Sequence, residues 1–133
     1  MQKINPMQKQ PKNEVLMSES HIQQQIVRWY RNTYCLKHHT PRCLIFSVPN
    51  ESNGVRAMKL IQTGLYPGCA DLVICHSPNR PDNTNIWLFI EIKTATGTQS
   101  PKQKQFEQHC NQMGLRYELV RSLQDFIEVI KNL

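Results

Sequence analysis

The sequence has no long hydrophobic run, which excludes a simple membrane-spanning helix. None of its apolar stretches approaches the roughly 18 residues that such a helix needs. Residues 1–17 are rich in Gln, Lys and Asn and lack the apolar segment of a secretory signal. We therefore expect residues 1–17 to form a flexible tail. Residues 18–133 are long enough to build the hydrophobic core of one domain.

Closely spaced cysteine pairs are also missing. The five cysteines are odd in number and none forms a C-x-x-C pair, so we do not expect a disulfide framework. Cys75 stands beside His76, but a structural zinc site needs a second closely spaced ligand pair, which the sequence lacks. Free, buried thiols and a reducing, cytoplasmic location are expected.

Acidic residues are scarce. The chain has 10 Asp and Glu residues against 16 Lys and Arg, which gives a formal net charge of +6. A positive excess favours polyanionic partners, such as nucleic acid or an anionic surface, but it does not determine the fold. The excess is moderate, so it favours nucleic-acid binding without establishing it.

Hydrophobic periodicity predicts an α/β fold with a mixed central β-sheet flanked by helices. Ser100, Pro101 and Gln103 form a typical helix start with a capping box, and Ser18 or Ser20 can cap the first helix. The expected elements are a helix at 19–34, a strand at 43–48, a short helix at 55–63, strands at 71–75 and 86–93, a helix at 101–113, a strand at 117–120 and a helix after Ser122.

The strand at 86–93 ends with two opposite charges. Its sequence IWLFIEIK is apolar as far as Ile90, and Glu91 and Lys93 then share one face because strand side chains alternate. Charged groups at the margin of a core need a partner. An ion pair between the two is the simplest interpretation. A metal or phosphate becomes the better one if other polar residues converge on the same place.

Asp71 is the residue that can converge there. If the strands at 71–75 and 86–93 form a hairpin, Asp71 at the start of one lies beside Glu91 near the end of the other. Two neighbouring carboxylates repel unless a cation lies between them, and such oxygen ligands suit Mg²⁺. Lys93 would then face a metal-bound water and the developing phosphorane charge. This arrangement is suited to phosphodiester hydrolysis.

Asp71 followed by Glu91-Ile92-Lys93 resembles the PD-(D/E)XK nuclease superfamily, and the sequence is most similar to its VRR-NUC family over nearly all of residues 19–133. The residues that carry the resemblance are Glu19, Val48-Pro49-Asn50, Gly64-Leu65-Tyr66-Pro67-Gly68-Cys69-Ala70-Asp71, Glu91-Ile92-Lys93 and Ser100-Pro101-Lys102-Gln103. Ala70 replaces the proline of the superfamily pattern. That proline carries no chemistry, and Pro67-Gly68 already sets the turn.

The resemblance implies a restriction-endonuclease-like α-β-β-β-α-β core and the roles of the site residues. Asp71, Glu91 and the Ile92 carbonyl would bind Mg²⁺ or Mn²⁺, with Glu19 as a further candidate ligand. Lys93 would serve the attacking water, while Glu19 and Gln103 complete the catalytic set. Gln103 is equally well explained as a capping-box residue, and both roles can hold at once. Candidate DNA-phosphate contacts, chosen because they flank the site in sequence, are Arg56, Lys59, Lys102 and Lys104.

We expect a metal-dependent endodeoxyribonuclease from a bacterial or phage-infected cell. A two-fold homodimer would present two sites to branched DNA such as a Holliday junction, and a flap substrate fits the residues equally well. The alternative is a non-catalytic nucleic-acid-binding module of a replication or repair complex, in which the acids and Lys93 form a structural ion-pair network.

Overall fold

The fold is described from a computed structural model, which places residues 17–36, 43–49, 55–78, 81–82 and 84–133. The side chains of residues 55–57 are outside this description. The predicted tail, apart from Met17, and Asn50 of the family pattern also lie outside the described residues.

A four-stranded mixed sheet forms the centre of the domain. Its strand order is β1-β2-β3-β4. The first three strands are antiparallel neighbours, whereas β3 and β4 are parallel. The parallel pair requires a crossover, which α3 supplies. The strands are β1 (Leu44–Ser47), β2 (Leu72–His76), β3 (Ile86–Ile92) and β4 (Arg116–Val120).

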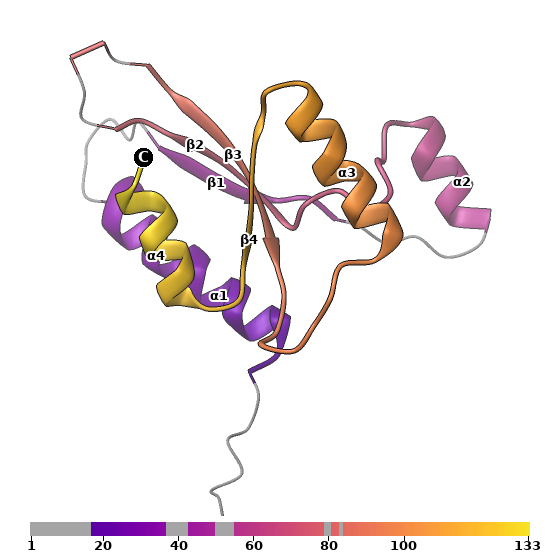
Figure 1. The fold of residues 1–133 in the computed structure, drawn as a ribbon, viewed down its shortest axis with the longest axis horizontal. Coiled ribbons are helices and arrows are strands. Elements are labelled where there is room, and N and C mark those ends of the chain that lie inside the picture. Colours follow the sequence, from indigo (N-terminus) through magenta and orange to yellow (C-terminus); the bar gives the residue numbers. More distant parts are fainter. Residues whose placement is uncertain (1–16, 37–42, 50–54, 79–80, 83) are drawn as a thin grey trace, which may run out of the picture.

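Two helices cover one face of the sheet and one covers part of the other (Figure 1). The helices are α1 (Glu19–Tyr30), α2 (Val55–Gln62), α3 (Pro101–Gln112) and α4 (Leu123–Lys131). Helices α1 and α4 bury Ile26 and Phe126 against Ile90 and Ile92 in the main core. Helix α3 packs Phe106 and Cys110 against Cys69 and Ala70 in a smaller cluster. Odd and even residues of β3 therefore belong to different layers.

The order and type of the predicted elements are confirmed, as is the hairpin between β2 and β3. The first helix differs in detail, because it is α-helical only to Tyr30 and continues as a π-helix, η1 (Arg31–Cys35). Thr33 donates its hydroxyl hydrogen to the Trp29 carbonyl, the acceptor that an α-helix would offer to the Thr33 amide. Ser18, and not Ser20, caps the helix by accepting a hydrogen bond from the His21 amide.

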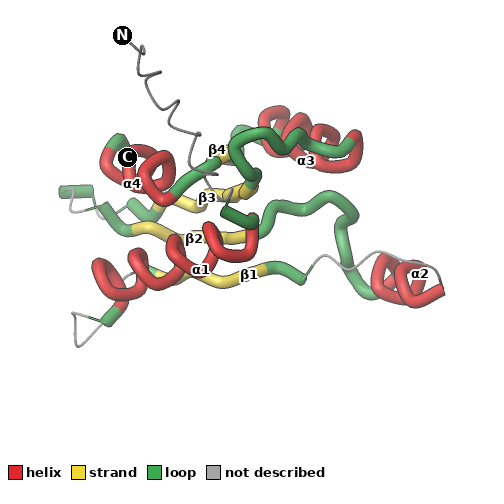
Figure 2. Tube along the Cα trace, turned by 90° about the horizontal axis from the view of Figure 1, so that it is seen from below, coloured by secondary structure: helices red, strands yellow, loops and turns green. Residues whose placement is uncertain are grey.

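Helix α2 stands apart from the sheet (Figures 1 and 2). Among the described elements it makes no substantial contact with another helix or strand. Its side chains Met58 and Ile61 are largely exposed. The two DNA-contact candidates Arg56 and Lys59 thus lie on a helix that does not pack against the sheet. The Arg56 side chain is outside the described residues.

Candidate active site

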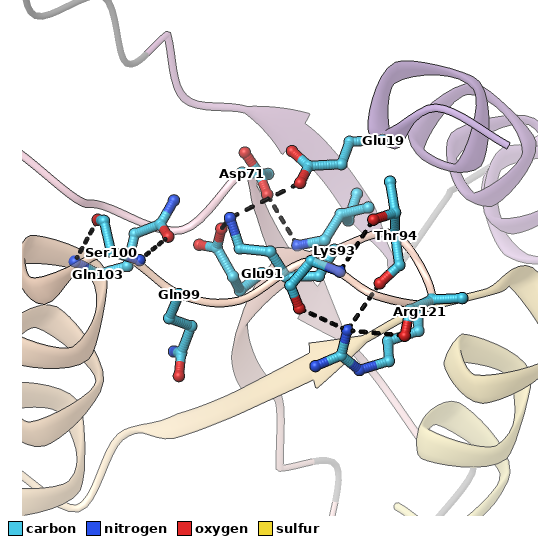
Figure 3. A network of polar contacts seen from close by, with 12 residues as sticks. Glu19, Asp71, Glu91, Lys93, Thr94, Gln99, Ser100, Gln103 and Arg121 are labelled. Carbon is cyan, nitrogen blue, oxygen red and sulfur yellow. Dashed lines mark hydrogen bonds and ion pairs between the residues drawn. The ribbon is translucent and has the colours of Figure 1, made fainter. Parts of the chain in front are cut away.

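The end of β3 brings the predicted acidic residues and lysine together. Glu91 is only 1% exposed and Lys93 only 7%, although both are ionisable. Lys93 Nζ lies 3.5 Å from Glu91 Oε1 and 3.7 Å from Glu19 Oε1. Figure 3 shows the carboxylate of Asp71 beside them. Four residues from α1, β3 and the chain before β2 thus meet at one point, as the sequence predicts.

Asp71 is positioned by the edge of β3. It lies just before β2, because the strand begins at Leu72. Its Oδ2 accepts a 2.8 Å hydrogen bond from the Ile92 amide. The N–H and C=O of one residue in an antiparallel strand point to the same edge, so the Ile92 carbonyl faces the same side as Asp71.

Burial makes Glu91 an unusually weak acid. Desolvation, followed by the neighbouring Asp71 carboxylate, raises the pKa of Glu91 from 4.5 to about 8, and Lys93 only partly opposes this. Glu91 Oε2 is also buried and receives no hydrogen bond from another donor group, while the Glu91 and Asp71 carboxyls lie close enough to share a proton. Burying a carboxylate oxygen in this way is costly, and such groups gather at functional sites. The unpartnered oxygen next to Asp71 is a position that a cation would fill.

The turn before Asp71 packs against the start of α3. Gly68 has a φ of +82°, and a Cβ on it would lie 2.4 Å from the Lys102 carbonyl carbon. Only glycine permits both the backbone angle and this close approach. Because of this contact, the beginning of α3 lies beside the chain that leads to Asp71. The glycine in the Pro67-Gly68 turn therefore has a packing role that the sequence pattern did not reveal.

Gln103 lies at this helix start and acts there as a capping residue. Its Oε1 accepts a 2.8 Å hydrogen bond from the Ser100 amide, and the Ser100 hydroxyl accepts one from the Gln103 amide. The predicted capping box is thus confirmed. Gln103 is set to one side of the carboxylates in Figure 3. Lys102 and Lys104 are exposed in the same first turn.

Arg121 is a supporting residue that no sequence motif indicated. Its guanidinium donates hydrogen bonds of 2.7 Å to the carbonyls of Thr94 and Gly97, and it also contacts the Ala95 carbonyl. The Lys93 amide in turn donates to the Val120 carbonyl at 3.0 Å. The end of β4 therefore fixes the main chain on which Lys93 is carried (Figure 3).

The arrangement has a limited capacity for metal binding by side chains alone. Within the described residues, no three His, Cys, Asp or Glu side chains gather closely enough to form a metal site by themselves. The polar contact that Glu19 makes is with Lys93, at 3.7 Å. A metal here would be held by two carboxylates with main-chain or water oxygens, which is the donor set that Mg²⁺ accepts.

The VRR-NUC domain model matches residues 12–124, which is most of the chain. The chain belongs to the VRR-NUC domain family. A solved structure named "VRR_NUC domain protein" is similar in fold, with a TM-score of 0.63 and 21% identity over 87% of each chain. No curated protein matches the chain.

This VRR-NUC chain is therefore a nuclease-type domain, with an α/β core like that of restriction endonucleases. Nucleases of this type generally use a divalent metal ion and act on nucleic acid. No helix in the part of the chain that the structure describes is long and apolar enough to cross a membrane.

Proposed function

We propose that this protein is a Mg²⁺- or Mn²⁺-dependent endodeoxyribonuclease that hydrolyses DNA phosphodiester bonds. The observation that carries the proposal is Glu91, a buried carboxylate beside Asp71 and Lys93 whose Oε2 receives no hydrogen bond. A structural ion pair needs no second carboxylate at the same point, and Asp71 makes the pair less favourable for an anionic Glu91. A divalent cation would balance the two carboxylates.

Each residue at the site then has a specific task. Asp71, Glu91 and the Ile92 carbonyl provide hard oxygen ligands, and the bound metal supplies Lewis-acid activation of water and phosphate. Lys93 orients the attacking water and stabilises negative charge on the phosphorane. Glu19 holds Lys93 from the opposite side at 3.7 Å. Gln103 uses its Oε1 for capping, so its side-chain NH₂ group can donate to water or phosphate.

The basic residues near the site are proposed phosphate contacts. Lys102 and Lys104 extend from the first turn of α3, which the Gly68 contact holds beside the site. Arg56 and Lys59 lie on α2, the helix that stands apart from the sheet (Figure 2). They would reach DNA farther from the cut.

We further propose that the protein acts as a homodimer on branched DNA, such as a Holliday junction or a flap, in the reducing cytoplasm. Support for dimerisation comes from an apolar sheet surface that α3 leaves open. Leu44 and Trp87 flank Cys75 in one register row and are 45% and 50% exposed. Phe46, in the next row, is 45% exposed. A Trp87→Glu variant should sediment as a monomer if this surface joins two copies.

The competing function is a nucleic-acid-binding module without catalysis, and the Lys93 contacts with Glu19 and Glu91 favour it. One experiment separates the two. Plain duplex, flap and four-way-junction DNA are incubated with Mn²⁺ and with either the unmodified chain or Lys93→Ala. Cleavage that disappears in Lys93→Ala and in excess chelator supports the nuclease. DNA that is bound tightly but stays intact in every lane supports the module.

A further inference from the structure

The outer face of α1 and η1 carries polar and basic side chains, interrupted by the apolar Val27 and Leu36. Residues at three- and four-residue spacing share one face of a helix. Here such residues line a groove, which includes Ser20, Gln23, Gln24, Arg28, Arg31 and Asn32. The opposite face of α1 is buried in the core through Ile22, Ile26 and Tyr30. The groove is therefore held on a rigid, well-packed element.

Its two arginines have no charge partner in the described structure. Arg28 and Arg31 are exposed, and none of the described carboxylates lies within ion-pair distance of either. Glu19 is the only acidic residue in the sequence from Ser18 to Leu36, and it contacts Lys93. Two unneutralised guanidinium groups three residues apart are well suited to phosphate oxygens, which they can contact through paired N–H groups.

The first residue that lines the groove is the sequence neighbour of Glu19 at the candidate active site. Ser20 follows Glu19, whose carboxylate reaches Lys93. With a rise of about 1.5 Å per residue, Arg28 lies about 14 Å and Arg31 about 18 Å along the axis from Glu19. A strand of duplex DNA advances about 3.4 Å per nucleotide, so these lengths correspond to about four and five nucleotides.

We propose that one DNA strand runs from the active site along the α1 groove, with Arg28 and Arg31 contacting phosphates about four and five nucleotides to one side of the cut. The side-chain amides of Gln23 and Gln24 add hydrogen-bond donors along the path. This inference rests on the proposed function for the position of the cut, but the arginine contacts can be tested by binding alone. The proposed complex is asymmetric about the cut, because only the DNA on one side of the cut lies on α1.

The test measures DNA affinity with the full chain carrying Lys93→Ala in Mn²⁺, with and without the double substitution Arg28→Gln/Arg31→Gln. Fluorescence anisotropy with a labelled four-way junction and a labelled duplex is recorded from 50 to 200 mM KCl. We expect the double substitution to weaken binding by about tenfold or more and to reduce the slope of log K against log salt by about two. Thermal unfolding of each protein confirms that the fold is intact.

Arg116→Gln is the matched control. Arg116 is also exposed, but it lies at the start of β4, opposite Leu88, and its guanidinium already pairs with Glu118 at 3.3 Å. Its substitution should leave affinity and salt slope unchanged. A second measurement uses DNA arms of decreasing length. Shortening one arm below about five nucleotides should weaken binding to the Lys93→Ala chain but not to the version lacking both arginines.

The outcomes distinguish this inference from the proposed function. Equal binding with and without Arg28 and Arg31, or an equal loss in Arg116→Gln, overturns the groove as a DNA path. Lys93-dependent cleavage together with such a result leaves the nuclease proposal intact. If the unmodified chain cuts no DNA but binds it through the two arginines, the nuclease proposal fails and the groove stands.

Discussion

Asp71 Oδ2 accepts a 2.8 Å hydrogen bond from the main-chain amide of Ile92. This contact links the chain before β2 to the edge of β3 and sets the carboxylate beside Glu91. It separates two roles of Asp71, one as an acceptor for the backbone and one as a charge. An amide side chain retains an acceptor oxygen but not the charge.

Asp71→Asn and Asp71→Ala should therefore differ in stability but not in activity. Both remove a proposed metal ligand, so neither should cleave DNA. Only alanine leaves the Ile92 amide without its acceptor, which should cost about 1–2 kcal/mol in the free energy of unfolding. Urea denaturation measures this difference. Cleavage by Asp71→Asn at the unmodified rate would remove Asp71 from the proposed site.

The raised pKa of Glu91 predicts how metal-free protein responds to pH. In the unfolded chain Glu91 loses its proton near pH 4.5, whereas the folded protein holds it to about pH 8. Between these values the folded state binds more protons, so its stability falls as pH rises. The midpoint of thermal unfolding should decrease from pH 5 to pH 8 in chelator.

Glu91→Gln is the matched control, because it removes the ionisable group and should make this part of the pH profile flatter. Mg²⁺ or Mn²⁺ should restore the stability of the unmodified chain at pH 8 and leave Glu91→Gln unaffected. Since binding displaces the Glu91 proton, metal affinity should rise with pH up to about 8. An identical pH profile in both proteins would contradict the assigned pKa.

Gly68→Ala should damage the fold at the site. The φ of +82° strains any other residue, and the added Cβ would overlap the main chain of Lys102 and Gln103. We expect a loss of at least about 2 kcal/mol in the free energy of unfolding. Gly64→Ala is the control, because Gly64 also has a positive φ, +112°, but nothing lies within 4 Å of its Cβ position. Equal losses would show that the close approach to α3 contributes nothing.

Arg121→Gln should loosen the loop after Lys93. The guanidinium contacts the carbonyls of Thr94, Ala95 and Gly97, and a shorter neutral amide cannot reach all three. Hydrogen exchange should become faster in residues 94–98, and DNA cleavage should slow because Lys93 is held less firmly. Arg116→Gln serves again as the surface control. Unchanged exchange in the loop would show that Arg121 does not anchor it.

The sequence alone determined the order of the elements and the meeting of Asp71 with Glu91 and Lys93. Alternation of side chains along β3 placed Glu91 and Lys93 on one face, and the hairpin brought Asp71 to the same end. These are local properties of strands and short connections, so they follow from periodicity and turn residues. The capping box of Ser100 and Gln103 is local for the same reason.

Only the tertiary structure decided the burial of Glu91, its unpartnered oxygen and its raised pKa. These depend on how closely α3, the Gly68 turn and α1 approach the end of β3, and such distances are set by packing between residues far apart in the sequence. The three-carbonyl contact of Arg121 and the contact of Glu19 with Lys93 arise in the same way. The sequence placed charges at the site, and the packing of three elements around them determined their low solvent exposure.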